Sequence, residues 1–144
     1  MSIHFEPDGA TYTAPTSRAV YHATWPTHLG SIMQNGLQPG FDGCVYLAGP
    51  KPAHAAMFVA IRGGEFDGTT EVEVDGETAT IPNFIQHDHI YVIEIPVDEL
   101  DPTKLGESGD HDPAAFPADT ESYTYDGTIP YNFDWNVYQL DMPK

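Results

Sequence analysis

The side chains best suited to chemistry lie in two short segments that have strand character. In Tyr21-His22-Ala23-Thr24, strand alternation places the imidazole of His22 and the hydroxyl of Thr24 on one face. In the segment 44–48, alternation separates Tyr46 from its two apolar neighbours. An imidazole and a hydroxyl exchange hydrogen bonds, and a tyrosine ring offers a flat surface for stacking. We therefore expect His22 and Tyr46 to line one cleft from neighbouring strands.

Two short helices are expected to position these segments. Pro26 suits the first turn of a helix, apolar residues follow at the spacing of one helix face, and Asn35-Gly36 is a stop signal. A loop rich in turn residues then leads to the second strand. A second helix begins at Pro52 and ends before Gly63-Gly64. The predicted order over residues 18–61 is strand, helix, strand, helix.

This ordered set resembles the ADP-ribosyltransferase superfamily, in its poly(ADP-ribose) polymerase-like and RNA 2′-phosphotransferase-like branch. The resemblance covers about a third of the chain and is carried by Tyr21-His22-Ala23-Thr24, Asn35-Gly36-Leu37-Gln38-Pro39, Val45-Tyr46-Leu47-Ala48 and the helix that follows. It implies a compact α+β fold. Two mainly antiparallel sheets would surround a cleft for nicotinamide adenine dinucleotide (NAD), with two short helices beside them.

The resemblance also implies a role for each residue of the site. His22 and Thr24 would bind NAD along the first strand, Tyr46 would stack on the nicotinamide, and Arg18 would contact the pyrophosphate. NAD is then a substrate, and no metal site is expected. The catalytic set would be His22, Tyr46 and a glutamate that steadies the ribosyl cation formed as nicotinamide leaves.

The catalytic carboxylate is expected in a late strand. The segment 121–126 leads into Gly127-Thr128-Ile129-Pro130, which resembles the family's acidic strand and the Gly-x-Ile-Pro segment after it. Glu121, near the start of that strand, matches the family's glutamate best. The register leaves Asp126 and Glu107 as alternatives.

The charge of the chain is its strongest compositional signal. Twenty-two acidic residues face five basic ones, which gives a net charge of −17 at neutral pH. Acid-rich, lysine-poor surfaces resemble those of proteins from halophilic organisms or their viruses. So few bases argue against nucleic-acid binding, except in high salt, because phosphate contacts need lysine and arginine. Two arginines also argue against an RNA 2′-phosphotransferase, which needs several of them to hold its phosphate.

The rest of the chain is expected to complete a single domain, residues 18–144, behind an N-terminal arm at 1–17. Alternation and the Asp75-Gly76 turn predict a hairpin of Thr70–Val74 and Thr78–Ile81. Residues 89–97 are predicted to form a central strand buried on both faces. Loops or connectors are expected at 63–67, 98–105 and 106–119, and a closing strand at 135–140.

Other reactive residues allow different interpretations. Cys44 is the only cysteine and lies among apolar residues, which favours a small buried thiol over a nucleophile. His87-Asp88-His89 and Asp110-His111-Asp112 could be considered as zinc or nickel ligands, but spacing fixes no third ligand for either.

The predicted function is therefore NAD-dependent ADP-ribosyl transfer to an unknown acceptor. The alternative is a non-catalytic structural or interaction module, such as a virion or toxin–antitoxin component, that keeps the fold without the chemistry. The sequence contains neither a secretory leader pattern nor a run of about 20 apolar residues, so a cytoplasmic location and no membrane partner are expected.

Overall fold

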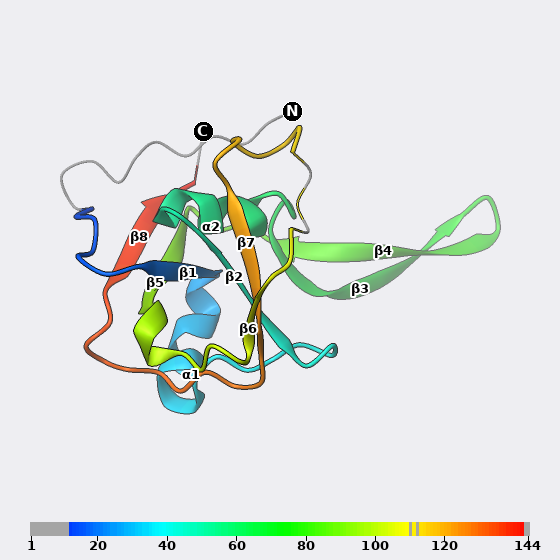
Figure 1. Cartoon of the computed structure of the whole chain (residues 1–144). Helices are drawn as coiled ribbons and strands as arrows, with labels where there is room; N and C mark the ends of the chain where they lie inside the picture. Colours follow the sequence, from blue (N-terminus) through cyan, green and yellow to red (C-terminus); the bar gives the residue numbers. More distant parts are fainter. Residues whose placement is uncertain (1–11, 110, 112, 143–144) are drawn as a thin grey trace.

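The fold is built on one antiparallel sheet of six strands (Figure 1). The computed structural model describes residues 12–109, 111 and 113–142. The strand order is β6-β7-β2-β1-β5-β8. The strands are β1 (Ala19–Thr24), β2 (Cys44–Gly49), β5 (His89–Pro96), β6 (Leu105–Glu107), β7 (Glu121–Asp126) and β8 (Val137–Asp141).

Two helices cover opposite faces of this sheet, at the positions that the sequence predicts. Helix α1 (Pro26–Asn35) packs Leu29 and Ile32 against one core cluster. Helix α2 (Pro52–Ala60) buries three of its alanines in the other cluster, beneath β1 and β5. Both helices begin with proline, which suits a first turn whose amide would be unpaired in any case. The α+β class with two helices is confirmed.

Strand β5 lies inside the sheet, between β1 and the edge strand β8, and is buried on both faces, as predicted. Ile90, Val92, Ile93 and Ile95 are 0% exposed. All six residues of β1 pair with β5, from Ala19 opposite Pro96 to Thr24 opposite Tyr91. This continuous pairing holds β1 rigidly on that side.

A buried carboxylate, Glu94, joins three neighbouring strands. Its oxygens accept hydrogen bonds from the Tyr21 and Tyr138 hydroxyls, each at 3.1 Å, and from the Asn136 amide at 3.0 Å. Tyr12, the first described residue of the N-terminal segment, continues the network, with its hydroxyl 3.1 Å from that of Tyr21. Burial and these contacts strongly raise the pKa of Tyr21. A buried carboxyl group whose oxygens accept hydrogen bonds avoids the cost of an unpaired polar group, and these bonds connect β5 to β1 and β8.

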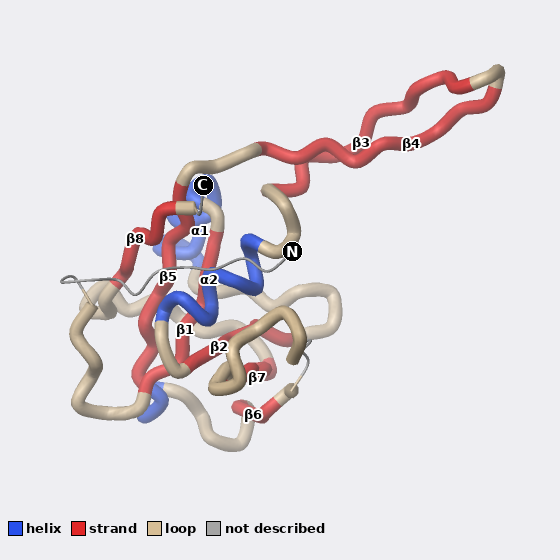
Figure 2. The backbone as a smooth tube through the Cα atoms, turned by 90° about the horizontal axis from the view of Figure 1, so that it is seen from above, coloured by secondary structure: helices blue, strands red, loops and turns tan. Residues whose placement is uncertain are grey.

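The second sheet is a long hairpin that extends away from the body of the protein (Figures 1 and 2). Its strands are β3 (Glu65–Val74) and β4 (Glu77–Ile85). Asp75 and Gly76 form the predicted turn, with φ values of 51° and 82°. Positive φ at both central positions suits the twist of a hairpin. We call the segment 65–85 the arm.

The arm is where the fold departs most from the sequence prediction. Two antiparallel sheets are present, but the second does not pack against the first around a cleft. Among the described residues, neither core cluster includes a residue of β3 or β4. The arm is also longer than predicted, because pairing continues past a bulge to Phe66 opposite Phe84. The segment 63–67, predicted as a loop, therefore contains the start of β3.

Smaller differences lie between β5 and β7. The predicted connector holds a 3-10 turn, η2 (Val97–Glu99), and then β6, which continues to Glu107 within the predicted loop. Leu105 pairs with Tyr125 and packs against the second core cluster, which draws this short strand into the sheet. Within the described residues, no helix is both long and apolar enough to cross a bilayer.

Candidate functional site

The candidate site lies where β1 and β2 separate. The recorded pairing between these strands is Tyr21 opposite Ala48, whereas β1 pairs with β5 along its whole length. Beyond that point a cavity of about 360 Å³ opens between the strands. It touches Ala23 and Ala55 from the core cluster under α2, and Val45 and Leu47 from the opposite cluster. The cavity therefore occupies the gap between the two strands rather than one face of the sheet.

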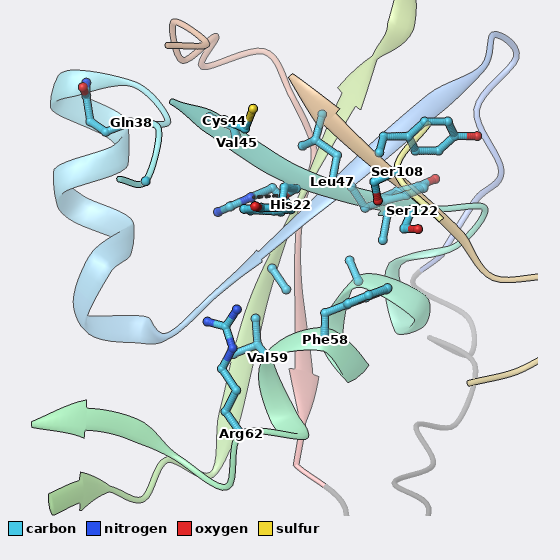
Figure 3. Close-up of a pocket in the computed structure, with 17 residues that line it drawn as sticks. His22, Gln38, Cys44, Val45, Leu47, Phe58, Val59, Arg62, Ser108 and Ser122 are labelled. Atoms are coloured by element: carbon cyan, nitrogen blue, oxygen red, sulfur yellow. Dashed lines mark hydrogen bonds between the residues drawn. The ribbon is translucent and has the colours of Figure 1, made fainter. Parts of the chain in front are cut away.

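The walls of the cavity are mostly apolar, with a few polar side chains among them. Figure 3 shows Phe58 and Val59 of α2 on one side and Val45 and Leu47 of β2 on the other. The polar residues that line it include His22, Gln38, Tyr46, Arg62, Ser108 and Ser122. An apolar cavity with a small number of placed polar groups is the usual form of a small-molecule site.

His22 bridges the gap between the strands with its side chain. Its Nδ1 lies 2.9 Å from the Tyr46 carbonyl oxygen. A carbonyl only accepts, so Nδ1 carries the proton in this bond and the neutral ring keeps Nε2 as an acceptor. Burial lowers the pKa of His22, and the nearby Arg62 charge lowers it further, against the opposing effect of the carbonyl bond. The site thus favours a neutral imidazole.

Tyr46 lines the same cavity as His22, but alternation places the two side chains on opposite faces of the sheet. His22 shares the face of Val20, which packs in one core cluster with Val45 and Leu47, and Tyr46 lies on the other face. Alternation in β2 points the Tyr46 ring away from the face of Val45, and its side chain is 53% exposed. The Tyr46 hydroxyl donates to the Asp42 carboxylate, which also accepts the Cys44 amide at 3.1 Å. These bonds lower the pKa of Asp42 and tie the Tyr46 hydroxyl to the loop before β2.

Arg62 is the cation of the cavity, and sequence reasoning did not assign it a role. It follows α2, and its side chain rises from the end of that helix toward His22 (Figure 3). The sequence carried a usable signal, because Arg62 is one of two arginines and stands between an apolar helix and Gly63-Gly64. Arg62 is exposed, and its guanidinium is able to pair with an anionic group that enters the cavity.

Arg18 and Glu121 lie in a neighbouring cavity of about 400 Å³. The Arg18 guanidinium donates to the Tyr123 hydroxyl at 2.5 Å, and that hydroxyl donates to Glu121 Oε1, also at 2.5 Å. The guanidinium carbon lies 5.2 Å from the centre of the Tyr123 ring, and Arg18 is 4.0 Å from Glu121. Burial raises the pKa of Tyr123, and the Glu121 charge adds to this effect.

The structure therefore does not bring Glu121 into the cavity of His22. Strand β7 pairs Thr124 with Tyr46 and Glu121 with Gly49. Three residues along a strand correspond to roughly 10 Å. Ser122 and Tyr123 line both cavities, so the two spaces share one wall.

The remaining predicted residues fall in different surroundings. Thr24 is buried, and its hydroxyl donates to the Trp25 carbonyl at 3.4 Å; it is not among the residues that line the cavity. Glu107 lines the second cavity with Glu121. Asp126 is exposed at the far end of β7, opposite Cys44. The Cys44 thiol is half-buried and lines the first cavity.

The histidine clusters make protein contacts in this structure. His87 Nε2 lies 2.7 Å from Glu65, and His89 Nδ1 lies 2.5 Å from Asp88. Asp110 and Asp112 lie outside the described residues, whereas His111 Nδ1 is 3.0 Å from the Ser122 hydroxyl. Across the part of the chain that the structure describes, no group of three or more His, Cys, Asp or Glu side chains is arranged to hold a metal ion.

Comparison with known proteins adds no relative. No protein-family model matches the chain, and it has no significant match among curated proteins or solved structures.

Proposed function

We propose that the chain binds NAD in the cavity between β1 and β2 and transfers its ADP-ribose to an acceptor. The observation that carries this proposal is the opening of the β1–β2 gap, where His22, Tyr46 and Arg62 line one largely apolar cavity. Neutral His22 offers an acceptor for a ribose hydroxyl, and the Tyr46 ring offers a surface for nicotinamide.

The cavity volume sets how much of NAD would be enclosed. About 360 Å³ lies near the lower end of the range of about 300–1,000 Å³ for small-molecule sites. Nicotinamide and its ribose would enter, and the rest of the dinucleotide would extend outward. Arg62, rather than Arg18, would meet the pyrophosphate, because Arg62 lines this cavity while Arg18 holds Tyr123.

Loss of nicotinamide leaves an oxocarbenium-like ribose that needs a carboxylate nearby. Glu121 remains the candidate, but it faces the neighbouring cavity, so the ribose would have to reach past the shared wall of Ser122 and Tyr123 to meet it. Tyr123 donates a hydrogen bond to Glu121, and Arg18 donates one to Tyr123. This chain of hydrogen bonds would position the carboxylate. An acceptor entering the second cavity would then face the ribose from the side of Glu121.

The proposal predicts distinct effects of three substitutions on NAD binding and turnover. His22→Ala and Arg62→Gln should each weaken binding by about tenfold or more, because each removes a contact made before the reaction. Glu121→Gln should keep the affinity but lower turnover by about 100- to 1,000-fold, because the amide carries no charge to oppose the cation. Calorimetry and mass spectrometry of products, both in about 1 M salt to screen the acidic surface, measure the two effects.

Lys51→Gln is the matched control for Arg62→Gln, because Lys51 is exposed at the other end of α2 and does not line the cavity. Absence of NAD binding by the wild-type protein would reject the function. Full activity of Glu121→Gln would keep the transferase but move the carboxylate role to Asp126 or Glu107.

A second candidate function is favoured by one separate observation. The arm extends from the body with large apolar side chains exposed, among them Phe66, Val74, Ile81 and Phe84. Exposed apolar surface of this kind is typical of an interaction module. The two functions are compatible, because the arm and the cavity use different residues.

A further inference from the structure

We propose that the arm is the docking element for a basic protein partner, which packs an apolar strip flanked by lysine or arginine against it. The proposal rests on the two faces of the hairpin and on its charge. It does not depend on what the β1–β2 cavity binds.

The outer half of the arm has one apolar face. The register places Val72 opposite Ala79, Val74 opposite Glu77 and Thr70 opposite Ile81. Side chains of directly opposed residues share a face, so Val72, Val74, Ala79 and Ile81 lie together, with Thr70 and the carboxylate of Glu77 beside them on the same face. Val74 is 55% exposed and Ile81 is 47% exposed. This is the side of the arm that a partner would cover.

The opposite face of the outer half is acidic and polar. Glu71 pairs with Thr80, and Glu73 pairs with Thr78, whose hydroxyl donates to the Glu73 carboxylate at 2.9 Å. An isolated two-stranded hairpin is only marginally stable in water, and a third strand or a packed face is what stabilises it. Among the described residues, neither core cluster includes a residue of the arm, and β3 and β4 pair only with each other, so a partner surface would supply the missing packed face.

Charge decides what kind of surface fits the arm. Six of the chain's 22 acidic residues lie in its 21 residues, and these include no lysine, arginine or histidine. The acidic residues are therefore about twice as dense on the arm as elsewhere. A second copy of this chain, with a net charge of −17, would be repelled, whereas a basic surface is attracted and steered.

Side-chain hydrogen bonds anchor the root of the arm to the body of the protein. Glu65 accepts the Thr27 hydroxyl at 2.7 Å and lies 2.7 Å from His87 Nε2 and 3.2 Å from His28 Nε2. These contacts lower the pKa of Glu65, so it stays charged. At the same root, Gln86 donates to the Gly63 carbonyl at 2.9 Å. A preorganised docking element loses less freedom on binding than a loose one.

The test uses a defined probe, a labelled eight-residue peptide of alternating lysine and valine, with fluorescence anisotropy as the readout. The wild-type protein should bind it, and the double variant Val74→Thr with Ile81→Thr should bind about tenfold or more weakly. Threonine keeps the β-branched shape, so the hairpin should still form. Glu71→Gln with Glu73→Gln should also weaken binding and flatten its salt dependence between about 0.15 and 1 M, where screening shortens from about 8 to 3 Å.

Matched controls lie on the body. Phe41→Thr removes a fully exposed apolar ring, and Asp98→Asn with Asp134→Asn removes two charges outside the arm; neither should change the affinity. Circular dichroism must show the same fold for every variant. Equal affinity of the arm variants, or equal binding of a lysine–serine peptide, overturns the proposal. Self-association of the wild type that Val74→Thr with Ile81→Thr abolishes also overturns it, because the occupant would then be a second copy.

Discussion

At the scale of single residues, His22 carries the most informative chemistry. Its side chain replaces a backbone contact between two strands, and burial holds its pKa below the ordinary value. The unfolded chain therefore binds the proton more readily than the folded one. Stability from this residue is fully present above the unfolded pKa of about 6.5 and is lost as pH falls from there toward the folded pKa.

We therefore predict that replacing His22 reduces acid sensitivity in that window. The wild-type protein should lose more stability than His22→Gln as pH falls from about 7.5 to 5, by less than about 1.4 kcal/mol per pH unit. Glutamine can still donate to the Tyr46 carbonyl but has no proton to gain. Denaturant melts at several pH values measure the difference. Parallel losses in both proteins would mean that His22 is not desolvated in the folded state.

At the residue scale, sequence reasoning singled out two of the residues that line the first cavity. His22 and Tyr46 could be placed together because their segments were predictable as neighbouring strands. Arg62 could be singled out as one of two arginines, but it could not be placed at the cavity, because the direction in which a side chain leaves the last turn of a helix depends on packing. The place of Glu121 depends on the β2–β7 register, which no local pattern specifies.

At the scale of elements, one residue at the end of α1 determines how the helix joins the segment after β7. Gly36 ends the helix with a φ of 80°, and a Cβ there would lie 2.7 Å from the Ile129 carbonyl oxygen. Leu37 and Ile129 exchange backbone hydrogen bonds of 2.8 and 3.1 Å at this point. The helix is thereby joined to the segment that follows β7.

Gly36→Ala should destabilise the protein by about 1–3 kcal/mol, because alanine rarely adopts this φ and its Cβ would meet backbone. Gly30→Ala is the control within the same helix. Nothing lies within 4 Å of its added Cβ, so it should stabilise by about 0.5–1 kcal/mol. Thermal melting of the two variants should shift in opposite directions. A shift of the same sign in both would contradict the geometry at Gly36.

The elements that could be predicted are those with a helix-start or turn signal in their own sequence. Pro26, Pro52 and Asp75-Gly76 act on their own neighbours, and the elements begin or turn where they indicate. The full length of the arm and the short β6 depend on partners distant in sequence, such as Phe84 for Phe66 and Tyr125 for Leu105. Those pairings cannot be read from a local pattern.

At the scale of the whole molecule, a net charge of −17 should make folding depend on salt. The screening length falls from about 30 Å at 0.01 M to about 3 Å at 1 M, which weakens repulsion among surface carboxylates. We expect the melting temperature to rise steadily across this range. Scanning calorimetry in potassium chloride measures it, with a charge-balanced domain of similar size as a control. A melting temperature that does not change with salt would contradict the expectation that the surface behaves like that of a halophilic protein.

The position of Cys44 makes the first cavity open to direct chemical observation. The chain has one sulfhydryl, and it lies at the cavity wall beside the loop that holds Tyr46. A thiol-reactive fluorophore therefore has a single attachment point, and its rate of attachment reports the accessibility of that wall alone. Small molecules can then be screened by the protection they give, with no assumption about the reaction they undergo.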